Sequence, residues 1–219
     1  MITKESIKND ESIRTYIRKA DESMAALGFT EHNVAHVTKV ADFAEKLLLA
    51  LGYPARSAEL AWIAGYMHDI GNIVNRHDHA QSGAVMAFRI LDKLGCDPEE
   101  LSTIVSAIGN HDEKTAFPVN EVAAAIILGD KTDVRRSRVR NQEPSTFDIH
   151  DRVNFAVSQS CTILSEDKKS VTLDLSIDSE ISPVLTYFEI FMDRMLLCRK
   201  AAECLNLDFH LCINGQNIL

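Results

Sequence analysis

Histidine and aspartate supply most of the side chains in this chain that could do chemistry. Four of the eight histidines are followed directly by aspartate, namely His68, His77, His111 and His150. The pair His68-Asp69 ends an apolar stretch, so both side chains should lie at the edge of the core. A carboxylate buried there is costly unless it is paired or bound to a metal. The pattern favours a metal site, and the alternative is that Asp69 caps a helix while His68 is a hydrogen-bonded core residue.

Further potential ligands occur on other segments that are predicted to be helical. They are His36 upstream, His79 and His111 downstream, and Asp130 after the run Ile126-Ile-Leu-Gly. Neutral imidazoles together with carboxylates suit Fe, Mn, Zn, Ni or Co better than Ca, and no cysteine lies near them in the sequence. Helical bundles commonly build metal sites from such side chains on facing helices. For His79 and His111 the alternative is a solvated loop histidine.

The first part of the chain must position these ligands, and its pattern is helical. From Glu5 to about Asp133 apolar residues recur three and four apart, without strand signals, which predicts about six helices. The clearest are predicted at Asn33–Leu51, Ser57–Ile70, His79–Leu94, Pro98–Asn110 and Asn120–Val134. The segment Ser57–Ile70 is apolar almost all round, so we expect it to be central and buried.

The pattern changes after Val139. Apolar and polar residues alternate from Phe155 to Ile163 and again from Val171 to Ile177. This pattern predicts two strands joined near Glu166–Lys169. Pro183–Leu205 is again helical, and Leu207–Ile213 alternates once more. The order is β-β-α-β, which would form a three-stranded sheet with one helix against it.

The polar segment Arg140–Ser145 separates the two patterns and is a candidate linker. The sequence therefore predicts a mainly α protein: a helical metal-binding domain at residues 1–140, followed by a small α+β unit at residues 147–219. The second unit carries no catalytic constellation. It could cap the pocket or pair two subunits as a homodimer.

Composition narrows the function classes. The 219 residues are 46% hydrophobic, with a formal net charge of −9, so we expect a compact protein that does not bind nucleic acid.

No segment approaches the roughly 20 apolar residues of a membrane span, and the five cysteines form no C-x-x-C pair. We expect a cytoplasmic protein with reduced thiols and no membrane partner. P-loop, nucleophile-elbow and zincin motifs are absent from the sequence.

The order His36, His68-Asp69, Asp130, with H-D-I-G in the middle, resembles the H…HD…D signature of the HD superfamily of metal-dependent phosphohydrolases. The resemblance covers about residues 30 to 140. The pattern His79-Ala-Gln-Ser-Gly-Ala84 and the triplet Asn110-His111-Asp112 are similar to branches that hold two metals.

The resemblance implies a role for each ligand. His36, His68, Asp69 and Asp130 would hold a first metal ion, with Asp69 bridging and counted as catalytic. His79 and His111 would complete a second site. One or two divalent ions are expected, from Fe, Mn, Zn, Ni or Co, with Mg as a further option.

An anionic substrate needs cations, and five follow Asp130 within ten residues: Lys131, Arg135, Arg136, Arg138 and Arg140. Arginine can bind phosphate through two parallel hydrogen bonds, so Lys131, Arg135 and Arg138, together with Arg76, are candidate substrate-binding residues. The alternative is a solvated face that pairs with surface carboxylates. His32 shares a predicted helical face with His36, and a surface position is expected for it; the alternative is an additional metal ligand or a residue that supports one.

The resemblance implies a phosphate ester as the substrate but does not identify which one. Asn72 stands where branches that cleave cyclic dinucleotides have lysine, and Asn110-His111 replaces a histidine pair, so that substrate is not assigned. The leading hypothesis is hydrolysis of a phosphate mono- or diester in a small anionic molecule, with a nucleotide favoured, by a metal-activated hydroxide. The alternatives are a di-iron oxygenase of the same fold and a metal-containing ligand-binding or regulatory module.

Overall fold

A computed structural model describes all residues of the chain, from Met1 to Leu219, and its first part is helical. The elements are α1 (Lys4–Asn9), α2 (Glu11–Ala26), α3 (Val34–Leu51), α4 (Ala55–Met67), the 3₁₀ helix η1 (Ile70–Ile73), α5 (His79–Lys93), α6 (Pro98–Gly109) and α7 (Glu121–Lys131). The mainly α fold is confirmed. Seven α-helices replace the expected six or so, because Asp10 ends α1 and also caps α2 through its side chain.

The second part is the small α+β unit that the alternating pattern predicts. Its elements are η2 (Arg136–Arg138), η3 (Pro144–Thr146), α8 (Ile149–Ala156), β1 (Val157–Leu164), β2 (Ser170–Ile177), α9 (Val184–Cys204), β3 (Asp208–Ile213) and β4 (Gln216–Asn217). The strands form one sheet in the order β1-β2-β3-β4. Strands β1 and β2 form an antiparallel hairpin, whereas β2 and β3 are parallel and are connected through α9.

The sheet has four strands, so the expectation of three was wrong. The additional strand β4 pairs antiparallel with β3, with Ile213 opposite Gln216. The two residues between them, Asn214 and Gly215, have φ values of 51° and 77°. Asn-Gly is the strongest short signal for a two-residue hairpin turn, because both residues tolerate positive φ. That signal was present in the sequence, but the strand after it is only two residues long.

The segment before β1 also differs from the expectation. Phe155 belongs to helix α8 and not to a strand, and the expected linker Arg140–Ser145 runs into the 3₁₀ helix η3. Helix α8 starts at an N-cap, where the Asp148 side chain accepts a hydrogen bond from the backbone N–H of Asp151. With eight residues, α8 is too short to show a clear helical period.

Helix α4 ends earlier than its apolar pattern predicts, and this places the His68-Asp69 pair in a turn. The helix stops at Met67 and not at Ile70. Asp69 has φ −95° and ψ 1°, and the chain continues into η1. The turn allows Gly71 to lie against the first residues of α5: a Cβ atom at Gly71 would be 2.0 Å from the carbonyl oxygen of His79 and 2.4 Å from the backbone nitrogen of Gly83.

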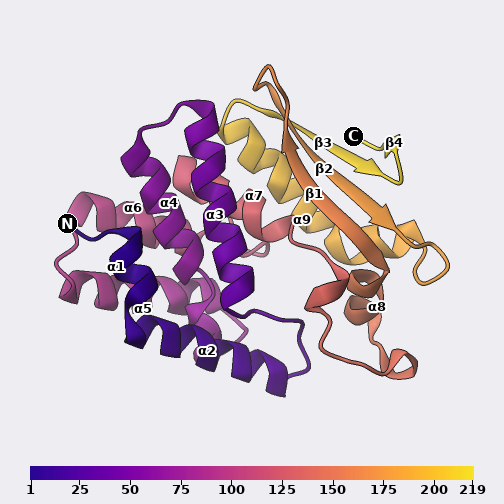
Figure 1. The fold of residues 1–219 in the computed structure, drawn as a ribbon, viewed down its shortest axis with the longest axis horizontal. Helices are drawn as coiled ribbons and strands as arrows, with labels where there is room; N and C mark the ends of the chain where they lie inside the picture. The colour runs from indigo at the N-terminus through magenta and orange to yellow at the C-terminus, as the bar shows by residue number, and fades with distance from the viewer.

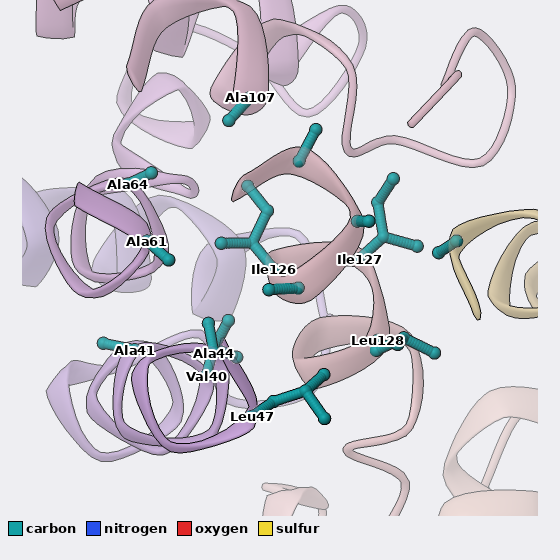
Figure 2. Packing of buried hydrophobic residues seen from close by; sticks show 14 of the residues in the cluster. Val40, Ala41, Ala44, Leu47, Ala61, Ala64, Ala107, Ile126, Ile127 and Leu128 are labelled. Atoms are coloured by element: carbon teal, nitrogen blue, oxygen red, sulfur yellow. The ribbon is translucent and has the colours of Figure 1, made fainter. Parts of the chain in front are cut away.

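The core of the helical part is built on α7, which is buried on all sides from Val122 to Gly129. Figure 2 shows Ile126 between Ala61 and Ala64 on one side and Val40 and Ala44 on another. Small side chains at these positions let the helices approach closely. At the contact between α3 and α4, a Cβ atom on Gly65 would be 2.9 Å from the Cα atom of Ala41.

Helix α9 connects the two parts of the molecule. In Figure 1 it lies behind the sheet, and α7 lies between it and the other helices. Buried apolar residues of both parts, such as Ile126, Leu173 and Phe191, belong to one continuous cluster. The division into two domains and the homodimer through the second unit stay predictions.

None of the helices is both long and apolar enough to cross a membrane.

The close approach at Gly71 generates a stability prediction. Replacing Gly71 with Ala should lower the free energy of unfolding by about 1–3 kcal/mol or more, because the new methyl group meets backbone atoms that cannot rotate away. Urea unfolding followed by circular dichroism measures the change. The matched control is Gly109→Ala, where the nearest atom is 3.5 Å away and no loss is expected. Equal stability of the two variants would contradict the interpretation.

Candidate metal centre

The six residues predicted as metal ligands lie together where several helices end. His36 is in the first turn of α3, His68 and Asp69 follow α4, His79 begins α5, His111 follows α6, and Asp130 is in the last turn of α7. The five residues other than Asp130 are buried, and the Asp130 side chain is 13% exposed. Five separate segments therefore contribute to one cluster.

One group of ligand atoms comes from His36, His68 and Asp130, which lie within 4.8 Å of one another. The Nε2 atom of His36 is 3.3 Å from Oδ1 of Asp130, and the Nε2 atom of His68 is 3.8 Å from the same oxygen. Asp69 Oδ2 is 3.3 Å from His68 Nε2 and 3.7 Å from His36 Nε2. All four residues of the predicted first site thus converge.

A second group overlaps with the first and contains His68, Asp69 and His111, again within 4.8 Å. The Nε2 atom of His79 is 3.1 Å from Nε2 of His111 and 3.6 Å from Oδ1 of Asp69. His79 therefore adjoins this group without being part of it. Asp69 is close to both groups, one carboxylate oxygen near each.

The hydrogen bonds of the imidazole rings determine where their protons lie. The Nδ1 atoms of His68, His79 and His111 are 2.7, 3.1 and 2.6 Å from backbone carbonyl oxygens, which can only accept. Nδ1 of His36 is 2.8 Å from a carboxylate oxygen of Asp133. Each Nδ1 must therefore carry the proton, so a neutral ring presents a lone pair at Nε2.

The ligand cluster fits a divalent cation. The buried atoms Nε2 of His36, Nε2 of His68 and Oδ2 of Asp69 have no hydrogen-bond partner. Lone pairs that face one another across a few ångströms repel, and a cation bound between them would turn this repulsion into coordination. Histidine nitrogen with carboxylate oxygen is a ligand set of divalent transition metals.

The protonation states agree with this interpretation. Burial alone would raise the pKa of Asp69, but its interactions with the neighbouring imidazoles, His68 first, outweigh burial and hold this pKa well below 3.8. The same pairing with Asp69 raises the pKa of His68 against the effect of burial, so a metal ion would compete with a proton for that ring. For Asp130 the cation of Lys131 likewise outweighs burial and lowers the pKa. Burial lowers the pKa of His111 well below 6.5. Ionised carboxylates and a neutral imidazole are the forms that bind metals.

Sequence reasoning missed the residues that hold the ligands in place. Asp133 is buried and accepts hydrogen bonds from His36 and, at 2.6 Å, from Lys39. Asn72 donates to Oδ1 of Asp69 at 2.8 Å. Asp133 follows Asp130 by three residues, one helical turn, and that spacing was the available signal.

His32 is buried, so the expected surface position was wrong. Its ring nitrogen Nδ1 is 2.7 Å from the carbonyl oxygen of Thr30, and the ring centroids of His32 and His36 are 5.8 Å apart. His32 lies before α3 and not on its face, because Asn33 is the N-cap of that helix.

The predicted cationic residues do not form one cluster. Arg76, Lys131 and Arg138 line the cavity beside the ligand cluster, whereas Arg135 is not among its lining residues. Arg135 donates instead to Asp133. Arg136 donates to the carbonyl oxygen of Phe155, and Arg140 pairs with Asp21.

The cavity beside the ligand cluster has a volume of about 840 Å³ and is strongly polar, with three hydrophobic residues among the 25 that line it. Asp69, His79 and Asp130 of the ligand cluster are among its lining residues. Residues of α8 and α9 line it as well, among them Asn154 and Arg194. Both parts of the chain therefore enclose the same space.

Metal binding to this cluster should stabilise the fold. At a Mn²⁺ concentration of 100 times the dissociation constant, the free energy of unfolding should rise by about 2.7 kcal/mol. We expect His36→Gln to lose most of this increase, because it removes a ligand nitrogen. The matched control His77→Gln changes a histidine whose side chain is 76% exposed and should retain the increase. Thermal unfolding with and without Mn²⁺ tests this, and an equal response of both variants would contradict it.

The carboxylate of Asp133 should tune metal affinity through His36. Asp133→Asn keeps the shape but removes the charge that polarises the imidazole, and we expect the Mn²⁺ affinity to fall about 10- to 100-fold. Isothermal titration calorimetry gives the affinity. An unchanged dissociation constant would mean that Asp133 only supports the fold.

The chain is similar to a known domain family and to individual proteins. The model of the HD domain family matches residues 33–145. An uncharacterized protein of Methanocaldococcus jannaschii is 27% identical over 203 residues, which cover 82% of this chain and 77% of that protein. The crystal structure of a predicted HD superfamily hydrolase from an uncultured Thermotogales bacterium has 24% identity and a TM-score of 0.41.

The match to that crystal structure covers 53% of this chain and 66% of the other chain, just under two thirds of its length. The family model matches more than half of the present chain, from the N-cap of α3 to η3, and includes all six candidate ligands. The chain belongs to the HD domain family.

Proposed function

We propose that this protein is a metal-dependent phosphohydrolase that acts on a small phosphate ester, with a nucleotide as the favoured substrate. The observation that carries the proposal is the convergence of four imidazole Nε2 atoms and two carboxylates beside a polar cavity that Asp69, His79 and Asp130 line. Such a cluster has no structural use that an apolar core would not serve at lower cost.

A divalent metal ion, when bound, supplies a Lewis acid that lowers the pKa of water and neutralises phosphate charge. The chain supplies the ligands already oriented. The hydrogen bonds at Nδ1 fix the ring planes of His68, His79 and His111, and Asn72 holds one oxygen of Asp69. Because the supporting groups are backbone carbonyls and a buried amide, little rearrangement is needed when the ion binds.

The cations around the cavity have distinct roles. Lys131 is buried, and its Nζ lies 2.7 Å from both Glu113 Oε2 and Asp130 Oδ2, so we assign it to positioning Asp130. Arg138 donates to the carbonyl oxygens of Glu31 and Asp133 through all three nitrogens. Neither group is free to bind an anion.

Arg76 is the predicted cation that can reach a substrate. Its Nη1 is 3.3 Å from both Asn72 Oδ1 and His79 Nε2, and both contacts are long for hydrogen bonds. If His79 used its Nε2 lone pair to hold a metal ion, it would no longer accept from Arg76. The guanidinium would then be available for a phosphate oxygen.

The cavity also indicates the size and character of the substrate. Its volume of about 840 Å³ is within the range of small-molecule sites, about 300–1,000 Å³. Its lining is mostly polar, which suits a hydrophilic ester. The chain's net charge of −9 opposes binding of a nucleic-acid backbone.

The test combines elemental analysis with an ester-hydrolysis assay. Purified protein is analysed for bound transition metals and then incubated with a panel of nucleoside mono- and diphosphates and phosphodiesters in the presence of Mn, Fe, Co, Ni or Mg. Products are detected as inorganic phosphate from the mono- and diphosphates and as the monoester from the phosphodiesters. We expect hydrolysis that depends on added metal, and activity with Mg or Mn would exclude an oxygenase reaction. Metal binding without hydrolysis of any ester would contradict the proposal.

Asp69 gives the sharpest variant. Asp69→Ala removes an oxygen near each of the two ligand groups, so we expect both metal content and phosphate release to fall below detection. Asp92→Ala, on the exposed side of α5, is the matched control and should keep both. A folded Asp69→Ala protein with full metal content and activity would show that the ligand assignment is wrong.

A further inference from the structure

Helix α9 forms one wall of the cavity. This wall contains an arginine, and the helix lies outside the region that the HD domain model matches. Ile190, Phe191, Asp193 and Arg194 of α9 line the cavity. Arg194 is the cation of this wall, and its side chain is 20% exposed. The family match ends at residue 145, so it assigns no role to this helix.

Two contacts hold the Arg194 guanidinium in place. Its Nε atom donates to Oε1 of Glu113 at 3.1 Å, and its Cζ atom lies 4.5 Å from the ring centroid of Phe191. The hydrogen bond involves Nε, and the aromatic contact involves the flat face of the guanidinium. The two terminal nitrogens donate to no protein atom. An arginine that is oriented in this way keeps a pair of parallel donors for an anion.

Arg194 is linked to the ligand cluster by a short chain of ion pairs. Glu113 accepts from Arg194 through Oε1 and contacts Lys131 through Oε2, and Lys131 contacts Asp130. Burial would lower the pKa of Arg194, but the charges of Glu113 and Asp130 raise it above its ordinary value. The guanidinium therefore stays protonated beside the candidate metal centre.

We propose that Arg194 binds the phosphate group of the substrate through its terminal nitrogens, so that the C-terminal unit completes the substrate site. This rests on the proposed function for the identity of the ester, and on the geometry of α9 for the anion site. Arginine suits this role because its planar donors match two oxygens of one phosphate.

Inorganic phosphate is the probe, because it tests the anion site without turnover. Its affinity for Mn²⁺-loaded protein is measured by isothermal titration calorimetry for the wild type, for Arg194→Gln and for Arg199→Gln. Arg199 is the matched control: it lies on the same helix, its side chain is 50% exposed, and it is not among the residues that line this cavity. We expect Arg194→Gln to weaken phosphate binding about 10- to 100-fold and Arg199→Gln to leave it unchanged.

The metal content and the melting temperature of each Arg194 variant are measured as well. They distinguish the loss of a contact with phosphate from a loss of structure. Arg194→Lys keeps the charge but not the paired donors, and we expect an intermediate affinity with full metal content. For the best ester in the panel, Arg194→Gln should raise KM more than it lowers kcat.

The outcomes separate this inference from the proposed function. If the wild type hydrolyses an ester while Arg194→Gln binds phosphate and ester as well as the wild type does, the anion site is wrong and the hydrolase assignment stands. If the wild type hydrolyses nothing but Arg194→Gln loses phosphate affinity, the hydrolase assignment fails and the anion site stands. Wild-type protein that binds no phosphate at millimolar concentration would overturn the anion site.

Discussion

The structure depends on bringing six ionisable side chains, five of them buried, to one meeting point of helix ends. Burying such groups is costly, and the protein offsets the cost by giving the Nδ1 atom of each ligand histidine a fixed acceptor. For His68, His79 and His111 the acceptor is a carbonyl three residues earlier. Gly65 and Ile108 belong to the last turns of α4 and α6, whereas Arg76 lies in the segment before α5. The three hydrogen bonds turn the Nε2 atoms toward the shared centre.

Close helix packing brings these ends together. Glycine and alanine at the contacts of α3, α4 and α7 remove the bulk that would separate the helices, as at Gly65 and Gly129, whose added Cβ atoms would lie 2.9 and 3.1 Å from their nearest neighbours. Gly71 plays the same part for the turn after Asp69. Metal affinity and fold stability are thus coupled, because a shift of one helix moves one ligand relative to the others.

Ion pairs hold the charged side chains in place around the ligand cluster. Acidic groups near the centre are paired with cations: Asp130 and Glu113 with the buried Lys131, and Asp133 with the more exposed Lys39 and Arg135. Most arginines that follow Asp130 in the sequence are used in this way or in holding backbone carbonyls. Arg76 and Arg194, which both line the cavity, come from segments far apart in the sequence. The helical and α+β parts therefore contribute to one cavity.

The sequence by itself determined the fold class, the approximate helices and the six candidate ligands, because helical periodicity and the His68-Asp69 pair are local features. It also contained the Asn214-Gly215 turn signal for β4. Only the tertiary structure decided which cations face the cavity, that His32 is buried, and that Asp133 and Arg194 adjoin the site. Those properties depend on contacts between residues distant in sequence, such as Arg194 with Glu113, and no local pattern encodes which partner a long, flexible side chain will reach.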